Sequence, residues 1–184
     1  EPFPSAETDE KLRLLVRRAA EGGYNMLRVW GGGIFEHEAF YAACDEMGVL
    51  VTQDFLMACG QYPEEDDAFI EKLKHETEYA AIALRNHPCL AWWSGDNENA
   101  VSGDENMAHY SGRRAALEGI APILDELDPV RPFLPSSPYG GTPYASGVRG
   151  TTHNTQFLGT FFAWVRGEDL SDYRRIMESY LSRF

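Results

Sequence analysis

The stretch Asn25-Met26-Leu27-Arg28-Val29-Trp30-Gly31-Gly32-Gly33 is a short apolar and aromatic run that stops at three glycines. Such a run is typical of a buried β-strand followed by a tight turn. Before it, the apolar residues from Leu12 to Ala20 recur at helical spacing, and Gly22-Gly23 is expected to end that helix. A helix that leads directly into a strand is the repeating unit of parallel α/β folds.

The same alternation continues along the chain. It predicts parallel strands joined by crossover helices, either in an eight-stranded (β/α)8 barrel or in an open doubly wound sheet. Periodicity alone does not choose between the two. We expect further strands at Val49–Gln53, Cys89–Ser94, Arg131–Ser136 and near Thr151, and further helices ending at Gly48 and over Glu65–Arg85, Asn106–Glu118, Ala121–Leu127 and Ser171–Leu181.

Length and charge limit the class of protein. The 184 residues suffice for one domain, and we expect residues 1–184 to form a single one. The net charge of −13, from 16 basic and 29 acidic side chains, repels phosphate backbones and anionic lipid. Nucleic acid and membranes are therefore disfavoured as partners, and no apolar run is long enough to span a bilayer.

The cysteines and histidines do not indicate a metal or a cofactor. No CxxC pair occurs, and Cys44 and Cys89 stand among apolar neighbours as small core residues, which favours a reducing, cytoplasmic location. The five histidines show no metal-binding spacing. The stretch His75-Glu76-Thr77-Glu78-Tyr79 begins like a zinc-protease motif, but Tyr79 occupies the place of the second histidine.

Polar residues follow each predicted strand. Because the carboxyl ends of parallel strands meet on one face, we expect these side chains to converge there, as they do in barrel enzymes. They are Arg28 and Trp30, then Gln53-Asp54, then Ser94 to Asn99, and finally His153. An aromatic ring, an arginine, an amide and several carboxylates on one face suit a carbohydrate substrate, and a carboxylic acid in such a cleft can protonate a departing glycosidic oxygen.

Four motifs in this order resemble the β-mannosidases of glycoside hydrolase family 2. The first is Asn25 to Ile34, and the second is Gln53-Asp54-Phe55, followed by Ala58-Cys59 and Tyr62-Pro63. The third runs from Arg85-Asn86-His87-Pro88 to Asn97-Glu98, and the fourth is Asp128-Pro129-Val130-Arg131-Pro132-Phe133-Leu134-Pro135-Ser136-Ser137-Pro138. Together they cover residues 25 to 138.

The resemblance implies a (β/α)8 barrel and hydrolysis of terminal β-mannosides with retention of configuration. Glu98 matches the general acid/base of the family, and Asn97 matches the asparagine that contacts the sugar 2-hydroxyl. The remaining matches to substrate-pocket positions are Arg28, Trp30, Asp54 and His153.

The chain also departs from the family pattern. Asp96 stands where the family usually has asparagine, and Asn154 stands directly after His153 where many members have an aromatic residue. The retaining mechanism needs a second carboxylate as nucleophile, and the family's Ser-Glu-Phe-Gly-like segment does not occur here. We therefore expect a partial barrel, approximately strands two to six with their crossover helices. The isolated chain is expected to be inactive and to self-associate through open sheet edges.

Other interpretations stay open at this point. An exo-β-glucosaminidase of the same family is the nearest enzymatic alternative, and a non-catalytic carbohydrate-binding fragment is another. A nucleotide-binding open sheet is disfavoured, because no phosphate-binding glycine pattern occurs at a strand-to-helix turn. Among the site residues, Arg28 could be a structural ion-pair partner, Trp30 a core aromatic, Asp54 a helix cap and His153 a buried, satisfied histidine.

Overall fold

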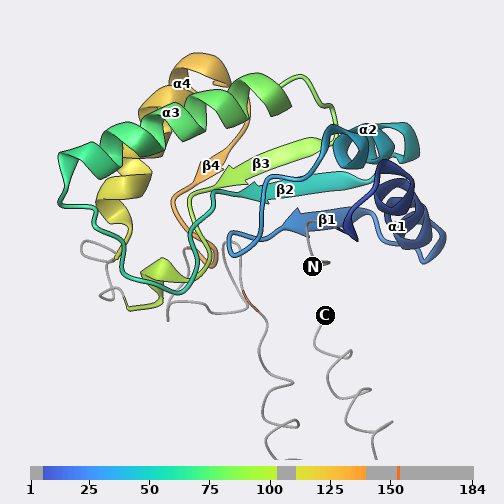
Figure 1. Ribbon diagram of the computed structural model, residues 1–184, viewed down its shortest axis with the longest axis horizontal. Coiled ribbons are helices and arrows are strands. Elements are labelled where there is room, and N and C mark those ends of the chain that lie inside the picture. The colour runs from blue at the N-terminus through green and yellow to red at the C-terminus, as the bar shows by residue number, and fades with distance from the viewer. Residues whose placement is uncertain (1–5, 103–110, 140–152, 154–184) are drawn as a thin grey trace, which may run out of the picture.

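The structure is a computed structural model that describes residues 6–102, 111–139 and 153 (Figure 1). Four short strands form one sheet with the order β1-β2-β3-β4, and every neighbouring pair is parallel. The elements in chain order are α1 (Asp9–Glu21), β1 (Met26–Val29), α2 (Glu38–Met47), β2 (Leu50–Asp54), α3 (Asp67–Leu84), β3 (Leu90–Ser94), the 3-10 turn η2 (Asn99–Ser102), the π-helical turn η3 (Ala115–Ile120), α4 (Ala121–Leu127) and β4 (Phe133–Leu134).

The strand order decides between the two predicted architectures. Each strand pairs with the next one along the chain, so the sheet grows in one direction only. Right-handed crossovers that always advance in the same direction place the helices on one face of the sheet, whereas a doubly wound sheet reverses its direction. The prediction of a parallel (β/α)8-barrel sector is confirmed. The predicted strand near Thr151 and helix Ser171–Leu181 lie outside the described residues.

Local chemistry sets where the helices begin and end. Thr8 caps α1 by accepting a hydrogen bond from the backbone N–H of Lys11, and Asp66 caps α3 by accepting one from Ala68. Gly48 ends α2 in the left-handed conformation, with φ of 69°, as its place after the predicted helix suggested. Glu64, just before the Asp66 cap, accepts hydrogen bonds from backbone N–H groups of residues 112, 114 and 115.

One predicted helix boundary is wrong. Separate helices were expected over Asn106–Glu118 and Ala121–Leu127, but η3 runs directly into α4 without a break. Pro122 falls in the first turn of α4 and has no N–H to donate, and the turn before it is wider, with Ala121 N–H bonded to Ala116 O. Residues 106–110 lie outside the described part of the chain.

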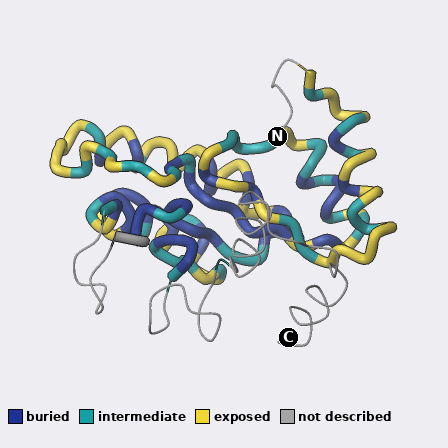
Figure 2. The backbone as a smooth tube through the Cα atoms, turned by 90° about the horizontal axis from the view of Figure 1, so that it is seen from below, coloured by how far each residue is buried: buried dark blue, intermediate teal, exposed yellow. Residues whose placement is uncertain are grey.

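The apolar core lies between the sheet and the helices. Figure 2 shows that buried residues concentrate along the strands, while the outward faces of the helices are exposed. Adjacent residues on a strand face opposite ways, so only one of Trp92 and Trp93 can pack under the helices. Trp93 does so: it is fully buried, stacks on Phe55 at 5.6 Å between ring centroids, and donates its indole N–H to Asp128 after α4. Trp92 alternates to the opposite face of the sheet. Within the described residues, no helix has both the length and the apolar character needed to cross a membrane.

Candidate active site

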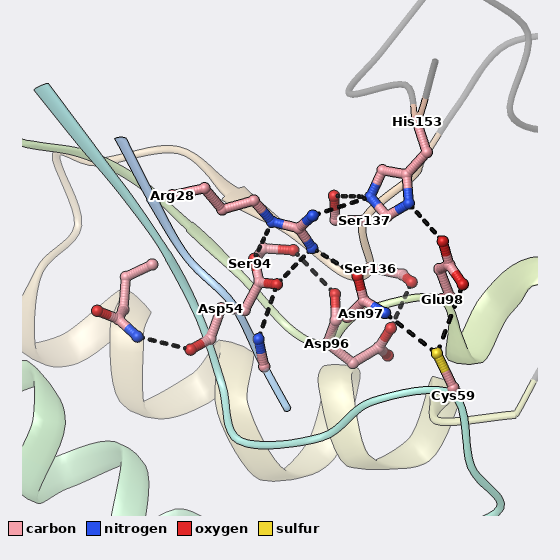
Figure 3. Close-up of polar contacts among 12 residues, drawn as sticks. Arg28, Asp54, Cys59, Ser94, Asp96, Asn97, Glu98, Ser136, Ser137 and His153 are labelled. Atoms are coloured by element: carbon pink, nitrogen blue, oxygen red, sulfur yellow. Dashed lines mark hydrogen bonds and ion pairs between the residues drawn. The ribbon is translucent and has the colours of Figure 1, made fainter. Parts of the chain in front are cut away.

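The polar side chains predicted at the strand ends do converge (Figure 3). Two glycines allow the loops beyond the strands to approach closely. A Cβ atom at Gly31 would lie 2.4 Å from the carbonyl oxygen of Met57, and one at Gly95 would lie 2.2 Å from that of Pro135. Both distances are too short for any other residue. The segments after β1, β2, β3 and β4 are therefore drawn together at the carboxyl edge of the sheet.

Arg28 on β1 and Asp54 at the end of β2 form an ion pair at the base of this cluster. The guanidinium donates twice, from Nη2 to Oδ2 at 2.5 Å and from Nε to Oδ1 at 3.3 Å. The backbone N–H of Gly31 donates to the same carboxylate. The Asp54 side chain is 1% exposed, and its burial raises the pKa of that carboxyl, an effect that Arg28 opposes.

Asn97 connects this ion pair to the next loop. Its Oδ1 accepts from Arg28 Nη2 at 2.8 Å, and its Nδ2 donates to the Cys59 sulfur at 3.2 Å. Asn97 also forms parallel bridges with Ala58 on one side and with Ser137 on the other. The amide therefore stands at the centre of the cluster in a fixed orientation, and its second N–H hydrogen has no partner within the described part of the chain.

Glu98 projects its carboxyl from a left-handed backbone position, with φ of 64°. A non-glycine residue in this region is uncommon and is often found at functional sites. Its two carboxyl oxygens face different partners: Oε1 lies 2.7 Å from Nδ1 of His153, and Oε2 lies 3.4 Å from the sulfur of Cys59. The hydrogen bond with His153 holds the pKa of Glu98 below its ordinary value. A general acid profits from a raised pKa, which a second carboxylate close by would provide.

His153 reaches Glu98 from the far end of the described chain. Its Nε2 lies 3.2 Å from Nη1 of Arg28 and 2.9 Å from Oγ of Ser137. Because a guanidinium only donates, Nε2 is an acceptor and the ring proton sits on Nδ1. That proton points at Glu98, so a neutral imidazole fits every contact.

Five of the six residues predicted for the site are thus joined by direct hydrogen bonds. Trp30 is the exception: its ring packs over Gly32, is 41% exposed, and has no polar contact with the other five among the described residues. The sequence did not single out Cys59 or Ser137 as site residues. The signal was present for both, because each lies in a motif that was recognised as a whole.

Comparison with known proteins agrees with these motifs. A β-mannosidase of Rattus norvegicus is 40% identical over 149 residues, which cover 76% of this chain, and a β-mannosidase B of Emericella nidulans is 46% identical over 150 residues. The crystal structure of the β-D-mannosidase from Dictyoglomus thermophilum matches with a TM-score of 0.74 at 40% identity, over 82% of this chain. The chain belongs to the β-mannosidase-like branch of glycoside hydrolase family 2.

Three further findings complete the comparison. The chain spans only 17% and 18% of the length of the two curated relatives and 19% of the Dictyoglomus structure. An exo-chitosanase of Amycolatopsis orientalis matches with a TM-score of 0.58 at 18% identity, which shows a common fold alone. No family model matches the chain.

Asp96 stands at a position where β-mannosidase-like proteins usually have an asparagine. Its side chain is fully buried, and Oδ1 accepts hydrogen bonds from Ser136 Oγ at 2.5 Å and from the backbone N–H of Asn99 at 3.1 Å. The other oxygen, Oδ2, is buried and has no hydrogen-bond partner among the described residues. Burial raises the pKa of Asp96 to about 7, and the charges of Asp54 and Glu64 act in the same direction. A protonated Asp96 has the same charge as an asparagine.

Three potential metal ligands do lie together elsewhere, although no metal was expected from the histidine spacing. The ligand atoms of Asp45, His87 and Cys89 are all within 4.8 Å of one another. Asp45, however, already accepts hydrogen bonds from Nδ1 of His87 at 2.6 Å and from the backbone N–H of Cys89 at 2.8 Å. These hydrogen bonds connect α2 to the residues just before β3, which is a structural role.

Proposed function

We propose that the full-length protein carrying this chain hydrolyses terminal β-mannosides with retention, and that Glu98 is its general acid/base. The observation that carries the proposal is the carboxyl of Glu98, which projects from a left-handed position after β3 with a hydrogen-bond partner on each oxygen. The surrounding arginine, amide and buried carboxylate give the polar pocket that a sugar requires. The identity to proteins named β-mannosidase supports mannose as the sugar.

Each neighbour has a distinct part in this proposal. Asn97, fixed by Arg28 and Cys59, presents its remaining N–H to a sugar hydroxyl. Trp30, which is 41% exposed, offers a ring face to the C–H side of the sugar. The Arg28–Asp54 ion pair fixes the base of the pocket, and His153 orients Glu98.

The chemistry proceeds in two steps. In the first step, Glu98 gives its proton to the glycosidic oxygen. At the same time a second carboxylate, about 5 Å from Glu98, attacks the anomeric carbon as the nucleophile. The Glu98 carboxylate then removes a proton from the water that hydrolyses the glycosyl–enzyme intermediate. We propose that the nucleophile is a glutamate in another segment of the full-length protein. Its carboxylate also raises the pKa of Glu98 before the first step.

The replacement Glu98→Gln tests the acid/base assignment. In the full-length protein, kcat/KM for an alkyl β-mannoside should fall by about 10²- to 10⁴-fold, because that leaving group requires a proton. An aryl β-mannoside with a strongly acidic phenol needs little protonation and should lose much less. Glu118 lies on the surface, paired with Arg114, so Glu118→Gln is the matched control. It should leave kcat/KM unchanged for both substrates.

Two outcomes would reject parts of this proposal. Near-normal turnover of the alkyl mannoside by Glu98→Gln would exclude Glu98 as the general acid. Faster turnover of a β-glucosaminide than of the matched β-mannoside would assign the protein to the exo-β-glucosaminidase activity instead. Binding of mannosides without turnover of any substrate would favour a carbohydrate-binding role.

A further inference from the structure

Cys59 is held beside the segment that carries Glu98. Its backbone N–H donates to the carbonyl oxygen of Asn97 at 2.8 Å, and the N–H of Asn97 donates back to Met57 at 2.9 Å. Cys59 has a φ of 49°, so it is a second non-glycine residue in the left-handed region at this site. This backbone pairing aims the thiol across the gap between the loops after β2 and β3.

The thiol lies between an amide and a carboxyl group. Nδ2 of Asn97 is 3.2 Å from the sulfur and can only donate, so the sulfur accepts this hydrogen bond. Oε2 of Glu98 is 3.4 Å from the sulfur and can accept the S–H proton. One neutral thiol satisfies both partners, whereas a thiolate would repel the carboxylate. Desolvation and the hydrogen bond to Glu98 both raise the pKa of Cys59, which keeps the thiol protonated.

Packing does not account for this arrangement. Cys44 and Cys89 are buried and fill space in the core, but Cys59 is exposed and its sulfur contacts polar groups. The terminal torsion of a glutamate is soft, so a carboxyl group with one partner can still rotate. His153 holds one oxygen of Glu98 and Cys59 meets the other.

We propose that Cys59 is a positioning residue that fixes the plane of the Glu98 carboxyl group by donating its S–H to Oε2 while anchored by the amide of Asn97. The inference rests on the acid/base role proposed for Glu98. The sulfur contacts both the Glu98 carboxyl group and the Asn97 amide, and the part of its effect that depends on Glu98 is the part that concerns proton transfer.

A double-mutant cycle between Cys59→Ala and Glu98→Gln in the full-length protein isolates this contribution. Cys59→Ala should lower kcat/KM for an alkyl β-mannoside by about 3- to 10-fold, with a smaller loss for an activated aryl mannoside. Cys59→Ser retains a donor and an acceptor and should recover most of the lost activity. In the Glu98→Gln background, Cys59→Ala should add no further loss. The alkaline limb of the pH profile should move to higher pH in Cys59→Ala. The charged form of Glu98 loses a hydrogen-bond donor there, which raises the pKa of Glu98.

Cys89→Ala is the control for a structural effect, since that buried thiol contacts Tyr41 and not the site. It should lower the rates with both substrates alike. An equal loss for Cys59→Ala with both substrates, repeated in the Glu98→Gln background, would overturn the positioning role, and so would an unchanged rate. A normal rate for Glu98→Gln alone would instead reject the acid/base assignment itself.

Chemical modification provides a measurement that does not depend on the folding of a variant. Methyl methanethiolsulfonate forms a mixed disulfide with a thiolate and releases methanesulfinate, so the S–H donor is removed. Treated enzyme should lose activity on the alkyl mannoside more than on the aryl mannoside, and dithiothreitol should restore it. Cys59→Ser should resist the treatment. Equal sensitivity of the wild type and Cys59→Ser would count against the proposal.

Discussion

The imidazole of His153 donates from Nδ1 to Oε1 of Glu98 at 2.7 Å, and this contact is the main reason that the pKa of Glu98 lies below its ordinary value. The other ring nitrogen, Nε2, lies 3.2 Å from Nη1 of Arg28, and a guanidinium can only donate, so Nε2 is the acceptor in that contact. Arg28 therefore sets the tautomer of the histidine, and the histidine favours the charged form of the glutamate. Arg28, His153 and Glu98 thus form a continuous chain of polar contacts that ends at the proposed acid/base.

His153→Ala should raise the pKa of Glu98. The general acid is active when protonated, so the alkaline limb of kcat/KM for an alkyl β-mannoside should move to higher pH. His153→Gln keeps an N–H donor and should fall between the wild type and His153→Ala. The pH profiles of the three full-length proteins provide the measurement. An alkaline limb that stays in place or moves to lower pH in His153→Ala would show that this hydrogen bond does not control Glu98.

The order of helices and strands could be predicted because each boundary has a local chemical cause. Asp66, Gly48 and Pro122 act through their own backbone or side chain, and the observed elements start and stop within a few residues of the expected positions. The choice of a barrel over an open sheet could not be predicted from periodicity, since it depends on which strands pair. The continuous helix through η3 was missed for a related reason: a π turn has no clear signal in the sequence.

The sequence allowed a prediction that the site residues converge, but not of the hydrogen bonds that they form with one another. Parallel strands place residues such as Arg28, Asp54 and Glu98 at one edge, whatever the details of the loops. The contacts of Glu98 depend on left-handed backbone at Glu98 and Cys59, which neither residue type indicates. The contact of Glu98 with His153 joins residues that are 55 positions apart in the sequence, and local sequence does not predict such a pairing. The roles assigned to the six site residues, and the single domain over residues 1–184, remain predictions.

Arg28→Met should destabilise the protein by leaving the buried carboxylate of Asp54 without its partner. Removing one member of a buried pair typically costs 3–5 kcal/mol, and about 3 kcal/mol is expected here, because the Arg28 side chain is 34% exposed. Urea unfolding of the full-length protein provides the measurement. Arg13→Met breaks the exposed pair with Glu46 and is the matched control, with little expected change. Equal midpoints for the two variants would contradict a structural role for the Arg28–Asp54 ion pair.

The 184-residue chain alone should self-associate and hydrolyse no mannoside. In the described sheet, β1 and β4 each have one neighbouring strand, and an unpaired edge tends to recruit another chain. Sedimentation should show a dimer or larger species, and an aryl β-mannoside assay should show no turnover. Leu14 and Leu15 on α1 are exposed apolar residues that could also cause association. Changing both to Lys distinguishes association through this helix surface from association through the strand edges. If these lysines alone produced a monomer, the strand edges would not be responsible.

Asp96→Asn should remove a pH-dependent loss of stability. The pKa of Asp96 is about 7 in the folded protein against an ordinary value of 3.8, so the folded state binds the extra proton. Its stability is therefore highest below about pH 4 and falls as pH rises to about 7, by roughly 4 kcal/mol for this group alone. Asn has the size of Asp without its charge, and its amide adds a donor that the unpartnered Oδ2 lacks.

Melting temperatures of the wild type and Asp96→Asn, measured between pH 4 and 8, should diverge as pH rises, with the variant higher at pH 8. Asp125→Asn on the surface of α4 is the control and should follow the wild type. Parallel curves for Asp96→Asn and the wild type would show that Asp96 is ionised at a normal pKa, with its charge stabilised by a partner outside the described residues.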